Sequence, residues 1–161
     1  KELSEGEPVE SRLVELSLYG SKIETMELLA NCSSLSLLDL RNTNIGERTL
    51  EICASLPLRE LHLDNSRIGP GTLKQTLKRF QQIRLLSLDN TSVNTDDLSD
   101  LPSLPNLMEL YCRNTQLDDR VLPHIIACKS LTAVTLAGSQ VSEEGIKDLK
   151  RRRPELSVKM E

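Results

Sequence analysis

The chain has 161 residues and a formal charge of −4, and 38% of its residues are hydrophobic. This length is enough for one domain with its own core. The acidic balance creates no overall attraction for nucleic acid or anionic lipid, and no apolar run reaches the roughly 18 to 20 residues that a membrane span requires. We therefore expect no nucleic-acid partner and no membrane insertion.

The hydrophobic residues are mainly leucine, since the aromatic residues are only Tyr19, Phe80 and Tyr111. The core must therefore be built from aliphatic side chains. The four cysteines contain no CxxC pair, whereas structural zinc sites usually use closely spaced ligands. We predict buried thiols in a reducing compartment, which implies an intracellular and cytoplasmic location, and we expect neither a metal nor a cofactor. The cysteines are Cys32, Cys53, Cys112 and Cys128.

One pattern recurs along the chain: LxxLxL, two variable positions, Ser or Thr, one variable position, and Ile, Val or Leu. Successive copies start 22, 23, 25, 24 and 24 residues apart. Such a regular period indicates a solenoid, in which each repeat buries its apolar side against its neighbours. The copies are LVELSLYGSKI from 13, LSLLDLRNTNI from 35, LRELHLDNSRI from 58, IRLLSLDNTSV from 83, LMELYCRNTQL from 107 and LTAVTLAGSQV from 131.

These segments resemble the leucine-rich repeat family, from Leu13 to about Met160. The resemblance implies an α/β solenoid with a parallel sheet on its concave face, short helices on its convex face and a protein-binding role. ANCSSL and IACKSL also resemble the cysteine-containing subtype familiar from F-box adaptor proteins, in which a Cys precedes the strand leucine by three. That resemblance implies substrate recognition for a ubiquitin ligase.

Alternation within each copy predicts a short strand, because successive side chains of a strand point to opposite faces of the sheet. The leucines of LxxLxL then form two inward columns across the stacked strands. Cys112 replaces a leucine in the second column, which supports its assignment to the core. The columns are Leu16, Leu38, Leu61, Leu86, Leu110 and Val134, and beside them Leu18, Leu40, Leu63, Leu88, Cys112 and Leu136.

A sharp turn must follow each strand. The Ser or Thr hydroxyls there can bond to the backbone of their own or the adjacent coil. The preceding residue is always Asn or Gly, the types that best tolerate left-handed dihedral angles. The two columns are Ser21, Thr43, Ser66, Thr91, Thr115 and Ser139, and Gly20, Asn42, Asn65, Asn90, Asn114 and Gly138.

The segments between strands favour helices. Apolar residues at spacings of three and four predict helices over 46–56 and 69–83. Prolines within 94–107 predict a broken or very short helix there. Pro123 is compatible with a helix only near the helix start.

The last return segment, 142–153, should begin with Ser142 as its N-cap, and 154–160 should form a partial seventh strand. We divide the chain into a polar segment or cap remnant at 1–12 and a repeat domain of six full repeats plus this strand at 13–161. The N-terminal end of the solenoid shows no capping pattern. We therefore expect the chain to be monomeric by itself or part of a larger chain or complex.

The outward side chains of the strands are the candidate functional residues. Tyr and Arg anchor protein interfaces more often than other residue types, and both tyrosines fall on this face. We predict a non-catalytic module that binds a protein partner on its concave face. Two roles are open for such a module: a substrate-recognition adaptor, or a structural scaffold subunit of a cytoskeletal or membrane-associated assembly. The predicted contact residues are Tyr19, Asp39, Arg41, His62, Asp64, Asp89, Tyr111 and Arg113.

Two further groups of residues allow other interpretations. Asp39 should lie beside His62 on the adjacent strand, and such a pair could act as a general base or, with Asp64 and Asp89, hold a cation. An open face without an activated nucleophile argues against catalysis. The basic run 147–153 fits either a solvated helix C-terminus or a docking patch.

Overall fold

The strands of this protein stack into one parallel sheet that follows the length of the chain. A computed structural model describes residues 12–21, 27–69 and 71–160. The strands lie in the sequential order β1-β2-β4-β6-β7-β8-β9, and all neighbouring pairs are parallel. Their bounds are β1 Glu15–Ser17, β2 Leu37–Asp39, β4 Glu60–His62, β6 Leu85–Ser87, β7 Glu109–Tyr111, β8 Ala133–Thr135 and β9 Ser157–Lys159.

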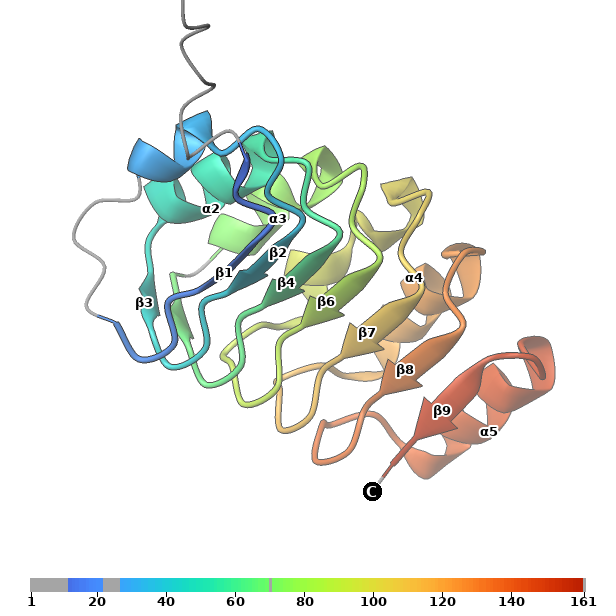
Figure 1. Ribbon diagram of the computed structural model, residues 1–161. Helices are drawn as coiled ribbons and strands as arrows, with labels where there is room; N and C mark the ends of the chain where they lie inside the picture. The colour runs from blue at the N-terminus through green and yellow to red at the C-terminus, as the bar shows by residue number, and fades with distance from the viewer. Residues whose placement is uncertain (1–11, 22–26, 70, 161) are drawn as a thin grey trace, which may run out of the picture.

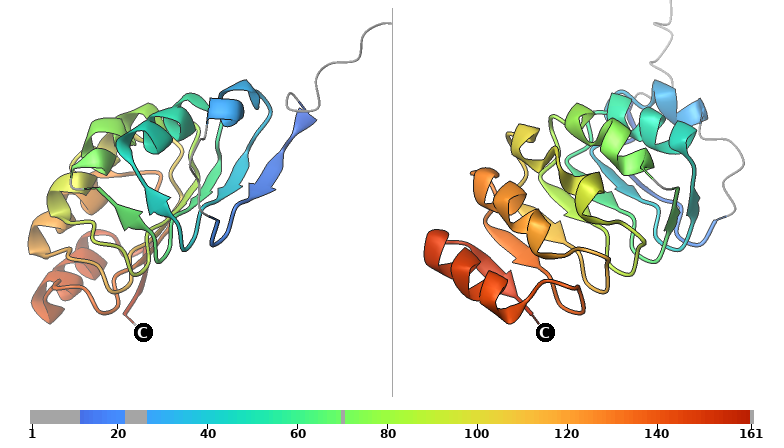
Figure 2. Two further views of the ribbon diagram at one scale, coloured as in Figure 1. Left: turned by 90° about the vertical axis from the view of Figure 1, so that its left-hand side faces the viewer. Right: turned by 180° about the vertical axis from the view of Figure 1, so that it is seen from behind.

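Short helices cover one face of this sheet, and the other face is open, as Figures 1 and 2 show. Together they form the α/β leucine-rich repeat solenoid expected from the sequence. The α-helices are α2 Glu47–Ser55, α3 Thr72–Thr76, α4 Leu122–Ala127 and α5 Glu143–Arg152. The 3₁₀ helices are η1 Glu27–Asn31, η2 Leu77–Arg79, η3 Thr95–Leu98, η4 Leu101–Ser103 and η5 Asp119–Val121, and a small second sheet pairs β3 Asn44–Ile45 with β5 Arg67–Ile68.

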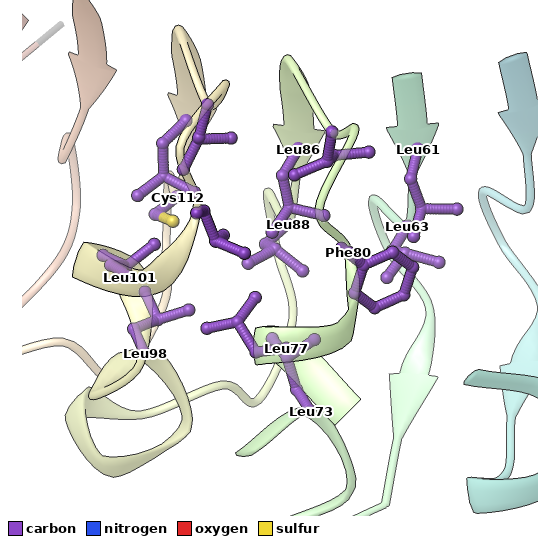
Figure 3. Packing of buried hydrophobic residues seen from close by; sticks show 14 of the residues in the cluster. Leu61, Leu63, Leu73, Leu77, Phe80, Leu86, Leu88, Leu98, Leu101 and Cys112 are labelled. Carbon is purple, nitrogen blue, oxygen red and sulfur yellow. The ribbon is translucent and has the colours of Figure 1, made fainter. Parts of the chain in front are cut away.

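The strand register confirms the first inward leucine column, and complete burial of the second column from Leu40 to Leu136 confirms the second. Leu38 aligns with Leu61, which aligns with Leu86, and each is at most 1% exposed. Cys112 is fully buried, and Figure 3 shows it near Leu88 and Leu101. Burying one leucine side chain contributes about 1.5–3 kcal/mol before conformational entropy is subtracted.

The turn columns also have the predicted conformations. The Asn and Gly residues that end the strands all have positive φ, from 51° to 68°. Thr43, Thr91 and Thr115 donate their hydroxyls to the carbonyl oxygen three residues earlier, over 2.6 to 2.8 Å. Ser66 instead donates to Leu40 O of the preceding coil, at 2.8 Å, and accepts from Thr43 N, so this turn ties two repeats together.

The helix predicted over 69–83 was too long. Gly71 has a left-handed φ of 70°, and the helix begins only after it, at Thr72. The α-helix ends at Thr76 and tightens into η2. Tightening to three residues per turn places Leu77 and Phe80, both buried, on the same side toward the core. The other predicted helices are confirmed: α2 lies within 46–56, two 3₁₀ helices replace a continuous helix in 94–107, and Pro123 lies in the first turn of α4.

The two ends of the sheet differ. Leu13, Leu16 and Leu18 of the first repeat are only partly buried, and Val14 is 49% exposed, so the edge at β1 is less covered than the middle. At the other end, β9 extends the sheet and Leu156 is buried. Of the segment predicted as a polar N-terminal element, 1–12, all but Arg12 lies outside the described residues.

Candidate binding face

Three columns of side chains form the open face of the sheet, here called the concave face. Strand register sets the first two, and the backbone bonds between coils that follow each strand set the third. The first column is Glu15, Leu37, Glu60, Leu85, Glu109 and Ala133. The second is Ser17, Asp39, His62, Ser87, Tyr111 and Thr135, and the third is Tyr19, Arg41, Asp64, Asp89, Arg113 and Ala137.

All eight predicted contact residues lie on the second and third columns. At the N-terminal end of the face, Arg41 binds Asp39 through two bonds, Nε to Oδ1 at 2.9 Å and Nη2 to Oδ2 at 2.8 Å. The Arg41 guanidinium also lies over the Tyr19 ring, 5.6 Å from its centroid. Bidentate and cation–π contacts restrict both side chains, so Tyr19 and Arg41 form one fixed element of the face.

Asp39 lies beneath the exposed side chains of Tyr19 and Arg41 and binds Arg41. It is only 7% exposed, and it also accepts a bond from Ser17 Oγ at 3.1 Å. The hydrogen bonds from Arg41 lower the pKa of Asp39 to about 2, against the smaller opposing effect of burial. Asp39 is therefore ionised and engaged with Arg41, so we expect it to hold Arg41 in place and not to contact a partner itself.

Asp64 and Asp89 lie side by side near the middle of the third column. Asp64 accepts from the Ser87 hydroxyl and, at 3.2 Å, from Asp89 N, while Asp89 Oδ1 accepts from Arg113 N at 2.7 Å. Burial raises the pKa of Asp89, and the neighbouring Asp64 carboxylate raises it further, whereas the bond from Arg113 N lowers it. Both carboxylates are thus oriented by the backbone of the next coil.

Tyr111 is the second tyrosine of the face. Its hydroxyl donates to Glu109 of the same strand, and this bond is the main cause of its raised pKa. Tyr111 is half-buried, in contrast to Tyr19, which is 59% exposed. Leu85 lies in register with Glu109 and is also half-buried, so an apolar surface accompanies the carboxylates here.

The acid–base pair considered from the sequence does not form. Asp39 and His62 are in register, but Asp39 bonds to Arg41 and Ser17, and the charged neighbour of His62 is Glu60, with Nε2 to Oε2 at 3.8 Å. Among the described residues, no group of three or more His, Cys, Asp or Glu side chains could hold a metal ion. The four cysteines are buried and form no disulfide, and burial raises the pKa of the Cys53 thiol to about 12.

Arg153 fits neither interpretation of the basic run 147–153, because it is neither solvated nor available for docking. It is 4% exposed, and its guanidinium donates to Cys128 O at 3.0 Å and Leu131 O at 2.8 Å. The other basic residues of the run, such as Lys147 and Arg151, are exposed. In the sequence, only Pro154 indicates that the helix ends before it and that Arg153 lies at the C-cap of α5.

Comparisons with known proteins agree on the fold. No protein-family model and no curated protein matches the chain. Among solved structures, internalin C2 from Listeria monocytogenes is 26% identical over 84% of this chain and 57% of that chain, with a TM-score of 0.66. A leucine-rich repeat protein from Leptospira interrogans is 23% identical over 93% of this chain and 38% of that chain, with a TM-score of 0.71.

A third solved structure is the Arabidopsis receptor kinase HAESA in complex with the peptide hormone IDA and the co-receptor SERK1. It is 15% identical over 95% of this chain and 26% of that chain, with a TM-score of 0.63. The chain thus spans from about a quarter to just over half of the length of these proteins. Together they show the leucine-rich repeat fold, without distinguishing the cysteine-containing subtype. No helix within the described ranges is long and apolar enough to cross a membrane.

Proposed function

We propose that this chain is a non-catalytic module that binds a protein partner on its concave face. The observation that supports the proposal most is the open face itself: seven parallel strands present outward side chains, while the helices cover the opposite side (Figures 1 and 2). Extended faces of this kind are the usual binding surfaces of solenoid proteins. HAESA, which has the same fold, was solved with a peptide hormone bound.

The side chains of this face are held in place before any partner arrives. Arg41 is fixed by Asp39 and Tyr19, and Tyr111 is fixed by Glu109. Each rotamer-rich side chain that is already ordered avoids an entropic cost of about 0.5–1.5 kcal/mol on binding. This order favours recognition of a partner by Tyr19, Arg41 and Tyr111, and Arg113 lies in the third column of the same face.

The hydrogen bonds between Asp39 and Arg41 also argue against a catalytic role for this face. Asp39, which is in register with His62, forms its bonds with Arg41. The concave face is open, so water is not excluded from any of these groups, whereas catalytic groups normally lie in a pocket. The arrangement fits recognition better than chemistry.

The direct test replaces the four proposed anchors by alanine: Tyr19, Arg41, Tyr111 and Arg113. We expect the dissociation constant for a partner captured from the source cell to rise by about a hundredfold or more, since buried Tyr and Arg anchors dominate interface energies. Calorimetry or surface plasmon resonance measures the change. A control with alanine at Arg48, Lys74, Lys78 and Lys147, all exposed on the helical side, should leave the affinity within about twofold. An unchanged affinity in the concave-face variant would refute the proposal.

The role within the cell is proposed to be that of a substrate-recognition adaptor. Cys32 and Cys128, the residues that carry this resemblance, are buried as core residues of the coils that lead into the strands. An adaptor should exchange partners and co-purify with a ubiquitin-ligase core. Purification in a constant ratio with one complex would instead identify a structural scaffold subunit of a cytoskeletal or membrane-associated assembly.

A further inference from the structure

The parallel sheet ends at β1 with an edge that pairs with no further strand of the described residues (Figure 2). In the next coil, Leu37 N donates to Val14 O at 3.1 Å. Glu15 is the register partner of Leu37, and its N–H points away from β2 and has no such acceptor within 12–21, 27–69 and 71–160. The carbonyls of Ser17 and Tyr19 face the same open side. Unpaired groups of this kind are a template for pairing with another strand.

Two inward leucines of β1 are incompletely covered at this edge. Leu16 and Leu18 are only partly buried, whereas Leu38 and Leu40, the equivalent residues of the next coil, are 0% exposed. The difference arises because a coil of a solenoid buries its leucines against the coils on both of its sides, and the first coil has a neighbour on one side only. A strand added to this edge covers both leucines.

The concave side of the same edge carries one acid and one base that do not pair with each other. Glu15 is exposed, and no ion pair joins it to another residue in the part of the chain that the structure describes. Arg41 lies over the Tyr19 ring, and its side chain is 45% exposed. Its bonds to Asp39 use Nε and Nη2, which leaves Nη1 for a further carboxylate.

The opposite end of the sheet, β9, is a poorer match for this edge than a second β1. Lys159 lies exposed on β9, and a lysine on an edge strand opposes pairing. Stacking β9 of one copy on β1 of the next is a head-to-tail contact, which leaves an open end on every assembly and continues without closing. A twofold contact between two β1 strands closes with two copies.

We propose that two copies of this chain form a twofold dimer by pairing their β1 strands antiparallel, with Ser17 opposite Ser17 of the second copy. In this register Leu16 lies opposite Leu18 of the second copy, so the partly buried leucines cover each other. Glu15 lies opposite Tyr19, and their backbone groups bond across the junction. The two sheets become one sheet, and the two concave faces become one surface. This inference goes beyond the proposed function and does not depend on it.

The charges at the edge favour the same register. Because Glu15 lies opposite Tyr19 of the second copy, its carboxylate reaches Nη1 of the Arg41 that lies over that ring, and the twofold axis makes this contact twice. The junction is short, since β1 has 3 residues. Interfaces that bury less than about 1,200 Å² are typically weak, so we expect a reversible dimer that forms with rising concentration.

Sedimentation velocity of the whole chain over about a hundredfold range of concentration tests the dimer. We expect the mass to rise from that of one chain to that of two and no further. Glu15→Arg places a cation against Arg41 of the second copy, so it should raise the dissociation constant of the dimer about tenfold or more. The matched control, Glu47→Arg at an exposed position of α2, should leave that constant within about twofold.

The register has a separate test that does not depend on the folding of Glu15→Arg. Residues paired directly across antiparallel strands have Cα atoms about 5.5 Å apart, which is within the range of a disulfide. Under a mild oxidant, Ser17→Cys should therefore give a disulfide-linked dimer. Ser92→Cys, exposed in the coil of β6, should give one about tenfold more slowly or less. The four native cysteines are buried and should not take part.

Three results would overturn the proposal. The first is the mass of a single chain at every concentration. The second is a dimer that Glu15→Arg leaves as tight as the wild type, or in which Ser17→Cys links no faster than Ser92→Cys, because such a dimer uses another surface. The third is growth beyond two chains, which identifies stacking of β9 on β1. The concave-face function is measured separately, with its protein partner, and stands or falls without the dimer.

Discussion

Arg153 shows, at the scale of a single residue, how this protein tolerates a charge in its interior. Its guanidinium lies at the C-terminal end of α4, where Ile125 O also accepts from Cys128 N and Ile126 O accepts from Lys129 Nζ. It donates to Ile125 O and Ile126 O, both at 3.3 Å, as well as to Cys128 O and Leu131 O. Its Nε bonds to Glu155. One side chain therefore caps a helix of the neighbouring coil and joins the last two repeats.

Replacing Arg153 by methionine should lower the free energy of unfolding by about 3 kcal/mol, because Leu131 O loses the guanidinium donor and Ile125 O, Ile126 O and Cys128 O each lose one of two donors, while the volume is kept. Chemical denaturation measures the change. Arg151→Met is the matched control: Arg151 lies two residues earlier on α5 and its side chain is 77% exposed, so its replacement should cost less than about 0.5 kcal/mol. Equal effects would show that the cap contributes nothing.

The Asp39–Arg41 pair predicts a dependence of stability on acid. Because the folded pKa of Asp39, about 2, lies below its ordinary value of 3.8, the pair stabilises the fold fully above about pH 4 and loses this effect as the pH falls toward 2. At pH 6, Asp39→Asn should lower the free energy of unfolding by about 1 kcal/mol, and this difference should shrink near pH 2. Urea titrations at both pH values test it. In an Arg41→Ala background, the difference should change less with pH, because only the bonds from Ser17 and from the backbone N of residue 41 then lower the pKa of Asp39.

At the scale of the element, the turn after each strand is set by the left-handed residue. Asn90 and Asn114 also bond to each other through their side chains, Nδ2 to Oδ1 at 2.8 Å. Gly138 lies next in this row, and a Cβ there would lie 2.0 Å from Asn114 Oδ1. Gly20, at the first turn, has a similar φ of 65° but open space around it. The two glycines thus separate backbone strain from crowding.

Gly138→Ala should therefore destabilise the protein more than Gly20→Ala. Both substitutions incur the left-handed cost of about 1–2 kcal/mol, and only the first also displaces Asn114 and its bond to Asn90, which adds about 1 kcal/mol. Thermal or urea denaturation of the two variants makes the comparison. In an Asn114→Gly background, where no Asn114 side chain remains to be displaced, Gly138→Ala should cost no more than Gly20→Ala does in the wild type. If Gly20→Ala proves the more costly change, crowding at Gly138 is not a determinant of this turn.

At the scale of the whole molecule, stability comes from contacts between successive coils. Each three-residue strand is too short to be stable alone, and each repeat buries its leucines only against its neighbours. Leu86, in the middle of the first inward column, is 1% exposed, whereas Leu16 of the same column is only partly buried at the β1 edge. The same residue type therefore makes unequal contributions along one column.

Leu86→Ala should reduce the free energy of unfolding by about 2–5 kcal/mol, the range found for fully buried leucines. Leu16→Ala should cost less than half of that, because less of its side chain leaves water on folding. Denaturation curves followed by circular dichroism give both values. Comparable losses at the two positions would mean that the β1 edge is as well packed as the centre of the solenoid.

The sequence alone determined the strands, the turns and the inward columns, because each follows from particular residue types that recur at a regular spacing. Alternating leucines define a strand face. An Asn or Gly two residues after the last leucine, with a hydrophobic residue three positions later, defines the turn. The return segments were less predictable. Apolar spacing over 69–83 could not reveal that a left-handed Gly71 delays the helix, since glycine occupies many conformations in an unfolded chain.

Only the tertiary structure decided which polar groups pair. The sequence placed Asp39 beside His62, but the register and side-chain reach joined Asp39 to Arg41 and left His62 near Glu60. The tertiary structure also buries Arg153, although its basic neighbours in sequence are exposed. The carbonyl groups that accept its hydrogen bonds belong to another coil, 22 to 28 residues earlier. Periodicity encodes the direction in which a side chain points, whereas its partner depends on which coils are stacked beside it.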